Sequence, residues 1–289
     1  MSLPKISIIV PVHNAGVYLE KCIESLINQT LKDIEIIVVL DCPSDGSEKV
    51  IEAFAAKDSR IKVIYNQENL HTGLSRNKGL LLAEGEYIGF HDHDDYSEPT
   101  MYEALYEEAK RGNFEVVRCN FTCIYTGTET PKIEKYKYPF ENNSSLEKDQ
   151  LYEYVCNGKV SCVIWNHIYK ADFLKKYDIK FLDSRSICSE DSIFFLEVYD
   201  KLENIGIVSD YLYHHVFHTK NTGQVYAYRS ISNRMSFFEG LYNFLNRQGI
   251  DKDKCFGFLS ENVASSLYSG SRQALIQYSW KEATAEIKL

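Results

Sequence analysis

The sequence has no closely spaced Cys-x-x-Cys pair, no long apolar run and no excess of positive charge. Its eight cysteines contain no Cys-x-x-Cys pair, which excludes a zinc ribbon and a dense disulfide framework. No apolar run approaches the roughly 18 residues that a membrane-spanning helix needs. A formal net charge of -9, from 41 acidic and 32 basic residues, argues against a nucleic-acid-binding surface. We therefore expect a soluble, cytoplasmic protein with reduced thiols and no nucleic-acid partner.

The first hundred residues alternate between short apolar runs and segments with helical periodicity. The apolar runs predict buried strands at 6–10, 34–40, 61–65 and 87–90. The segments between them predict helices at 17–29, 47–57 and 72–83. Strands separated by helices indicate right-handed crossovers, so the fold class is α/β with a mainly parallel sheet. Its ligand site is expected at the carboxyl ends of the strands, where polar segments follow.

The rest of the chain predicts a mixed region and then helices. A helix at 99–111 leads to a strand at 115–125, and the charged stretch 131–148 predicts a loop or lid. Helical patterns return at 229–248 and 254–277. The first of these has an apolar face made of Phe237, Phe238, Leu241, Phe244 and Leu245. Such a face usually packs on its own core, although it is also compatible with peripheral membrane association.

An acidic segment, Phe90–Asp95, places three carboxylates directly after an apolar run. Like charges this close need a proton, a basic side chain or a metal ion to offset them. No Lys or Arg lies between Lys78 and Lys110, which favours a metal. In an extended chain Asp92 and Asp94 share one side, where hard oxygen ligands suit Mg²⁺ or Mn²⁺. The alternative is a solvated turn that caps the next helix.

Three further residues have a functional and a structural interpretation. Asp41, just past a buried strand, could accept a hydrogen bond from a base or a ribose, or it could be a turn residue. His13 could stack on a base or begin a loop. Arg76 could pair with a diphosphate or with the acidic segment. Each of these positions is expected near the carboxyl ends of the strands.

The later part of the chain holds a second acidic pair and a tryptophan. Glu190 and Asp191 precede an amphipathic run, so one of them could be a general base, or both could begin a helix that Ser189 caps. Trp165 could stack on a sugar ring or fill the core. Spacing along the sequence does not decide between these interpretations.

Together these motifs resemble the inverting family 2 glycosyltransferases, GT-A fold (Rossmann-like) enzymes of bacterial polysaccharide synthesis. The similarity runs in family order through 8–14, 25–30, 76–79 and 85–99, and returns at 165–169 and 190–191. The resemblance implies a GT-A domain with a nucleotide-sugar-binding half at 1–112, an acceptor-binding half at 113–225 and a helical C-terminal extension at 226–289. We expect a cytoplasmic enzyme, and the C-terminal helices are compatible with a location at the inner face of the cytoplasmic membrane.

The resemblance implies metal-dependent transfer of a hexosyl or N-acetylhexosaminyl group from a UDP-sugar, with inversion by a single displacement. The implied acceptor is a hydroxyl of a glycan or of a lipid-linked acceptor. Asp191, with Glu190, is the implied catalytic base, Asp94 and Asp92 hold Mn²⁺ or Mg²⁺, and Trp165 is on the acceptor side. The implied donor-binding residues are Pro11, His13, Asn14, Asp41, Arg76, Asn77, Asp92 and His93.

The chain departs from the family pattern at several positions. Leu40–Pro43 stands where the family usually shows Asp-Asp-Gly-Ser, Ser189 replaces a usual glycine, and His91 and His93 flank the acidic pair. The altered segment motivates one alternative, a catalytically degenerate module that binds sugar-nucleotide or glycan. A sugar nucleotidyltransferase is a weaker alternative, because it needs a basic, glycine-rich loop after the first strand and residues 11–16 contain no Lys or Arg.

Overall fold

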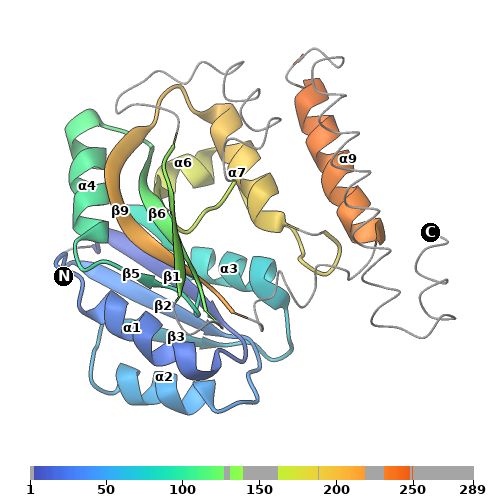
Figure 1. The fold of residues 1–289 in the computed structure, drawn as a ribbon. Coiled ribbons are helices and arrows are strands. Elements are labelled where there is room, and N and C mark those ends of the chain that lie inside the picture. The colour runs from blue at the N-terminus through green and yellow to red at the C-terminus, as the bar shows by residue number, and fades with distance from the viewer. Residues whose placement is uncertain are drawn as a thin grey trace, which may run out of the picture.

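The computed structural model describes residues 3–126, 131–138, 162–187, 189–218, 231–247 and 249. Within these residues the strands form one sheet in the order β3-β2-β1-β4-β8-β6-β9-β5, with β7 paired to β6 (Figure 1). The strands are β1 (Ile6–Val12), β2 (Ile34–Leu40), β3 (Ile61–Tyr65), β4 (Tyr87–Phe90), β5 (Tyr96–Ser97), β6 (Val116–Tyr125), β7 (Lys132–Tyr136), β8 (His167–Lys170) and β9 (Gly206–Phe217). The helices are a 3₁₀ turn η1 (Gly16–Tyr18), α1 (Leu19–Ile27), α2 (Ser47–Ala55), α3 (His71–Leu82), α4 (Met101–Gly112), α6 (Ala171–Lys176), α7 (Glu190–Lys201) and α9 (Ile231–Arg247).

The first four strands form the parallel part of the sheet, as predicted. β1 pairs with β2 and β4, and β2 pairs with β3, all in parallel register. Helices cover both faces of this part, which is why every residue of β1 and β2 is buried and both strands are apolar almost throughout. The carboxyl ends of four neighbouring strands therefore lie along one edge.

The second part of the sheet is mixed. β8 runs antiparallel to both β4 and β6, whereas β9 runs parallel to β6. The short β5, which follows the acidic segment, pairs antiparallel with β9. One prediction is wrong here, because 132–136 was expected in a loop and forms β7 on the outer side of β6. Three of the five residues of β7 are charged, Lys132, Glu134 and Lys135, so the strand has no apolar run in the sequence.

Two apolar cores lie on opposite faces of the sheet. One contains the buried side chains of α1 and α4, and the other contains those of α7 with Phe173 of α6. Three residues of the predicted apolar face of α9, Leu241, Phe244 and Leu245, are buried in the second core. α9 contacts α7 and lies beside it (Figure 1). Packing on the protein's own core is thus confirmed for these residues.

No helix in the described ranges is both long and apolar enough to cross a membrane. The helix predicted at 254–277 and most of the lid predicted at 131–148 lie outside the described residues.

Candidate active site

A buried carboxylate marks the end of β2. Asp41 Oδ1 accepts hydrogen bonds from Asn66 Nδ2 at 2.7 Å and from Leu70 N at 2.8 Å. The backbone oxygen of Asp41 accepts a third, from His13 Nδ1 at 2.6 Å. In the described part of the chain these side-chain bonds all go to Oδ1. The geometry thus fixes the carboxylate through one oxygen.

The loop after β1 is tied to the loop after β2. Asn14 Oδ1 accepts a bond from Ser44 N at 2.7 Å, and Asn14 Nδ2 lies 3.2 Å from His13 Nε2. Asn14 takes a left-handed φ of 51°, a conformation that asparagine tolerates better than most residues. On the same edge, His93 Nδ1 donates to Pro11 O at 3.0 Å. The structure therefore brings together the side chains that the sequence predicted for donor binding at the ends of β1, β2 and β4.

The acidic segment is a turn, which corrects one prediction. Asp95 N donates to Asp92 O at 3.3 Å, so the chain is not extended here and the expected alternation of side chains does not apply. Asp92 Oδ1 pairs with Arg76 Nη2 at 2.7 Å, and Asp94 Oδ2 lies 3.0 Å from His218 Nε2. The segment therefore has basic partners: Arg76, whose pairing the sequence left open, and His218, which lies 124 positions from Asp94.

Asp95 anchors the acidic segment to β9. Its Oδ2 accepts from Tyr213 Oη at 2.7 Å and from His215 Nδ1 at 2.9 Å, and its Oδ1 accepts from Val216 N at 2.7 Å. Burial disfavours the charged imidazole, but the Asp95 carboxylate outweighs it and raises the pKa of His215 to about 9. The pair is thus ionic at neutral pH. All of these contacts are internal, so Asp95 is a structural member of the cluster.

The two histidines of the acidic segment also hold it in place. His91 is fully buried, and its Nδ1 donates to Asp92 O at 2.9 Å. Burial lowers the pKa of His91 to about 4, so the ring is neutral. His93 reaches Pro11 as described above. The ring of His93 therefore fastens the turn to β1, whereas the ring of His91 bonds within the turn.

Arg76 joins the acidic segment to the start of α7. Its guanidinium is buried; Nη2 pairs with Asp92 and Nη1 lies 3.3 Å from Glu190 Oε1. Gly73 lets α3 approach the segment before α7 closely, because a Cβ there would lie 2.2 Å from Leu182 O. Of the two interpretations that the sequence left open for Arg76, pairing with the acidic segment is the one present.

The next residue of α3, Asn77, fastens the segment that leads to α7. Its Nδ2 donates to Phe181 O at 2.8 Å, and its Oδ1 accepts from Phe181 N at 2.9 Å. Both ends of the amide are therefore occupied. These two bonds hold the segment that leads to α7 against α3.

Asp191 lies in the first turn of α7. Ser189, just before the helix, has a left-handed φ of 60° and its side chain makes no capping bond, so capping by Ser189 is not what begins the helix. Asp191 Oδ1 instead accepts from Ser192 N at 2.8 Å. Burial, with the adjacent Glu190 carboxylate, raises the pKa of Asp191 to about 7, against the opposing charge of Arg76. A carboxylate with this pKa suits general-base chemistry near neutral pH.

Trp165 is buried, with 4% of its surface exposed. Its ring stacks on Tyr213, with centroids 4.3 Å apart, and meets the edge of Phe121 at 4.7 Å. These contacts favour the core interpretation of Trp165 over sugar stacking. Tyr213 also donates a hydrogen bond to Asp95, so Trp165 supports the acidic segment through Tyr213.

Sequence reasoning missed His218, whose ring stacks on Tyr18 with centroids 4.1 Å apart while its Nε2 reaches Asp94. It also assigned no role to Asn66. No local signal marks His218, because its partner lies 124 positions away. Asn66 follows a predicted strand, and that position was its one signal.

The carboxylates are compatible with a metal that a substrate helps to bind. Among the described residues, no group of three His, Cys, Asp or Glu side chains is arranged to hold an ion. Mg²⁺ and Mn²⁺ are often bound by one or two carboxylates together with substrate phosphates, so Asp92 and Asp94 fit that mode. They do not form a complete protein cage.

The comparisons with known proteins agree with the fold. The family model of Glycosyl transferase family 2 matches residues 7–177. The uncharacterized glycosyltransferase EpsJ of Bacillus subtilis (strain 168) is 34% identical over 215 residues, which is 73% of this chain and 60% of EpsJ. This chain thus spans about three fifths of that relative.

Two solved structures share the fold. S. aureus TarS 1–349 in complex with UDP-GlcNAc has a TM-score of 0.70 and 22% identity, over 96% of this chain and 77% of that chain. The mannosyltransferase PcManGT from Pyrobaculum calidifontis in complex with GDP-Man and Mn²⁺ has a TM-score of 0.59 and 13% identity, over 99% and 79%. These likenesses confirm the predicted GT-A architecture.

Proposed function

The chain belongs to glycosyl transferase family 2, and we propose that it transfers a sugar from a UDP-sugar to a hydroxyl of a glycan or a lipid-linked glycan. The proposal includes inversion by a single displacement. It assigns the nucleotide-sugar to residues 1–112, the donor half, and the acceptor to 113–225, the acceptor half. Association with a membrane surface and the role of 226–289 stay predictions.

One observation carries this proposal. A single buried guanidinium, Arg76, contacts both Asp92 at the end of β4 and Glu190 beside Asp191. A leaving group held near Asp92 and a base at Asp191 would then act on the same small volume from two sides. Single displacement requires this arrangement, because the attacking hydroxyl must be opposite the departing diphosphate.

The donor half supplies the nucleotide pocket. Asp41 Oδ2 is proposed to accept from the base, with Pro11, His13 and Asn14 around it. The bonds from Asn66 and Leu70 support this role, because they orient the carboxylate before any ligand arrives. The UDP-GlcNAc complex of TarS motivates the choice of uridine, and the GDP-Man complex of PcManGT is the reason to include guanosine donors in any assay.

The metal-binding residues in this proposal are Asp94 and Asp92. A bound Mn²⁺ or Mg²⁺ would neutralise charge on the departing diphosphate. The chain's own contribution is to keep the carboxylates in position. His218 and Arg76 orient one oxygen each, and His93 fixes the turn between them.

Asp191 is the proposed catalytic base, with Glu190 beside it. Its raised pKa lets it take the proton of the acceptor hydroxyl as that oxygen attacks the anomeric carbon. Arg76 and Asn77 become positioning residues rather than direct donor contacts. Their side chains are occupied by Asp92, Glu190 and Phe181, which supports this reassignment.

The test uses the full chain with UDP-sugars and GDP-mannose, in MnCl₂ or in EDTA, and measures release of nucleoside diphosphate and transfer to glycan acceptors. We expect Asp191→Asn to keep metal-dependent donor binding in calorimetry and to lose transfer by about 10²- to 10⁴-fold. Asp94→Ala should lose the metal-dependent binding itself. Asp178→Asn, at an exposed position, is the matched control.

Two outcomes would overturn the proposal. If Asp191→Asn transfers sugar at the parent rate, the base lies elsewhere. If the parent chain binds a donor tightly but turns over none across the panel, the degenerate binding module replaces the enzyme.

A further inference from the structure

Arg118 of β6 is a fully buried arginine in the acceptor half. Within the described residues none of its three guanidinium nitrogens has a hydrogen bond of good geometry, no carboxylate pairs with it, and the Tyr199 hydroxyl is its one polar neighbour. Burial lowers the pKa of Arg118 to about 10, so the group still carries its charge at neutral pH. A buried charge of this kind is normally paired.

The contacts that Arg118 does make compensate little of that charge. The guanidinium lies over the ring of Tyr138, and the Tyr199 hydroxyl lends it partial support. A cation–π contact stabilises a cation less than the loss of water destabilises it. The guanidinium is therefore in an environment that an anion would relieve.

A second buried polar side chain with one unused nitrogen lies directly opposite. His167 of β8 faces Arg118 in the antiparallel register, so the two side chains start from neighbouring positions on the same face of the sheet. His167 is also fully buried, and its Nδ1 has no hydrogen-bond partner among the described residues. Its Nε2 lies 3.0 Å from Tyr199 Oη. A guanidinium, an imidazole and a phenol thus gather at one place with donor capacity unused.

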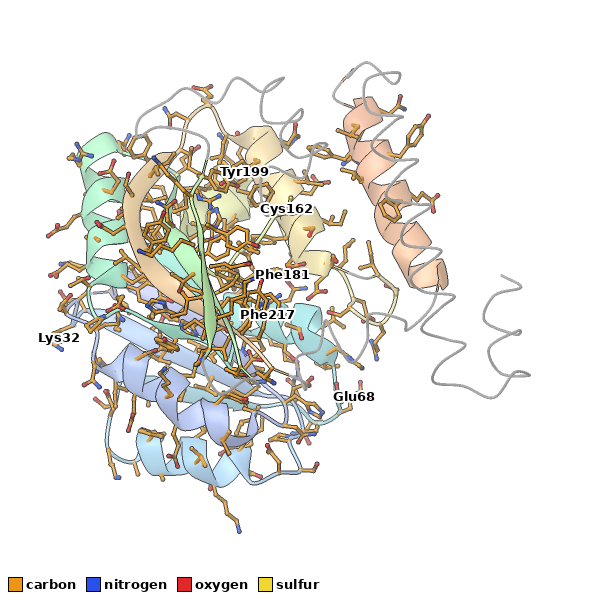
Figure 2. The ribbon with its side chains drawn as sticks, viewed as in Figure 1. Lys32, Glu68, Cys162, Phe181, Tyr199 and Phe217 are labelled. Carbon is orange, nitrogen blue, oxygen red and sulfur yellow. The ribbon has the colours of Figure 1, made fainter. Side chains whose placement is uncertain are left out.

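The cluster of Arg118, His167 and Tyr199 is connected to the proposed base, Asp191, through α7. α7 carries both Asp191 and Tyr199, and eight residues of helix separate them by about 12 Å. Cys162 lies near both the proposed base and the cluster, because the charges of Asp191 and Arg118 both act on its thiol. Figure 2 shows Cys162 and Tyr199 close together between the sheet and α7. The cluster therefore belongs to the acceptor side of the site, along the axis of α7.

We propose that Arg118, His167 and Tyr199 form an anion site that binds a phosphate group of the acceptor, about 12 Å along α7 from the reacting hydroxyl. The phosphate replaces the ring of Tyr138 as the partner of the guanidinium. This inference rests on the proposed function, because it extends the acceptor site of that enzyme. A phosphodiester of a polyol-phosphate chain and the diphosphate of a lipid-linked glycan share this chemistry.

The first experiment measures thermal unfolding of the full chain in EDTA, in sodium phosphate and in sodium chloride of equal ionic strength. EDTA removes divalent-dependent binding at Asp92 and Asp94. We expect phosphate to raise the Tm of the parent and of Arg118→Lys by more than it raises the Tm of Arg118→Met. In chloride, Arg118→Met should melt above the parent by a few degrees, because it removes an uncompensated buried charge.

The opposite result would overturn the proposal. If Arg118→Met melts well below the parent and the phosphate response is the same in both, Arg118 is a structural cation with a partner in its own chain. An equal response of parent and variant to phosphate with no change in Tm would also overturn it. General stabilisation by phosphate acts on parent and variant alike and does not affect this comparison.

The second experiment identifies the source of the phosphate. A synthetic ribitol-phosphate oligomer and a diphosphate-linked glycolipid in detergent micelles are each offered as acceptor, beside their phosphate-free analogues. Arg118→Met should raise the KM of one phosphorylated acceptor about tenfold or more and leave the phosphate-free analogue unchanged. An unchanged KM for both would contradict the site.

UDP binding in MnCl₂ is measured in the same preparations and should not differ between parent and variant. Loss of UDP binding in the parent would count against the proposed function itself. Intact UDP binding with an unchanged KM would count against the anion site alone.

Discussion

The donor half and the acceptor half treat their buried polar groups differently. At the ends of β1 and β2, Asp41 and Asn14 are held by hydrogen bonds to neighbouring loops before any ligand is present. In the acceptor half, Arg118 has no partner within the described residues, and Asp191 has a pKa raised by burial and by Glu190. In the proposed function, the first arrangement pre-organises the donor-binding residues. The second is an electrostatic cost that the proposed anion or the proposed proton transfer relieves.

The largest expected effect is the loss of stability on replacing Trp165 in the acceptor half. If it is core, Trp165→Ala should lower the free energy of unfolding by about 3–5 kcal/mol, because it leaves a cavity beneath Tyr213. Urea unfolding measures this. At temperatures where the variant is folded, the KM for acceptor should be unchanged.

Leu81 of α3 provides the control in the donor half, since it is 80% exposed and Leu81→Ala should change stability by about 0.5 kcal/mol or less. A stable Trp165→Ala variant with a raised acceptor KM would return Trp165 to the sugar-stacking interpretation.

Arg76 lies between the two halves, and its loss should affect the base more than the pocket. Arg76→Gln removes the positive charge that opposes the raised pKa of Asp191, so that pKa should rise further. Because the base works deprotonated, the acidic limb of kcat/KM should move up by about one pH unit, with the rate at pH 6 falling about tenfold.

Arg76→Lys should restore part of the profile, since it keeps the charge. Donor binding at high pH separates this effect from a collapsed site. An acidic limb at the same pH in Arg76→Gln and in the parent would contradict the positioning role.

Several features could be predicted from sequence because they are local. The bounds of β2, β3 and β4 agree with their apolar runs, and parallel topology then places the polar ends of four strands together. Partner choice is not local. Asp94–His218 and Arg76–Glu190 join residues more than 100 positions apart, and only the folded sheet brings them into contact. The sequence also did not predict that Arg118 is buried, because a lone arginine in a strand is usually expected to face solvent.

Asp191 and Asp45 should change the stability of the protein in opposite directions as the pH rises. The folded pKa of Asp191, about 7, lies above its unfolded value of about 3.9, so its ionisation destabilises the protein as pH rises between these values. Asp191→Asn should therefore gain Tm over the parent as pH rises from 4 to 8.

In the donor half the sign reverses. Burial raises the pKa of Asp45, but hydrogen bonds from Ser47 and Gly16 outweigh this and lower it. Asp45→Asn should lose Tm at neutral pH, and the loss should vanish as pH falls through the lowered pKa. Scanning calorimetry from pH 8 to below pH 4 measures both. Parallel pH responses in the two variants would remove the electrostatic contrast between the halves.

The smallest expected effect concerns two residues with left-handed backbones, one in each half. Ser189 has φ 60° and Cys42 has φ 51°, and each lies beside a functional carboxylate. A residue with a Cβ costs about 1–2 kcal/mol in the left-handed region, and replacing it by glycine removes this cost. About 0.4–1 kcal/mol of the benefit is lost again, because glycine has more conformational freedom in the unfolded chain. Ser189 makes no capping bond, so Ser189→Gly should stabilise the protein by up to about 1 kcal/mol.

Cys42→Gly should gain less, because it also removes the contact of Cys42 Sγ with Asn66 O at 3.4 Å. Chemical denaturation of both variants measures the difference, and transfer activity should be unchanged in Ser189→Gly. If Ser189→Gly destabilises the protein or lowers activity, the serine contributes to the base region beyond its backbone. The acceptor half would then contain a polar contact that the present geometry does not include.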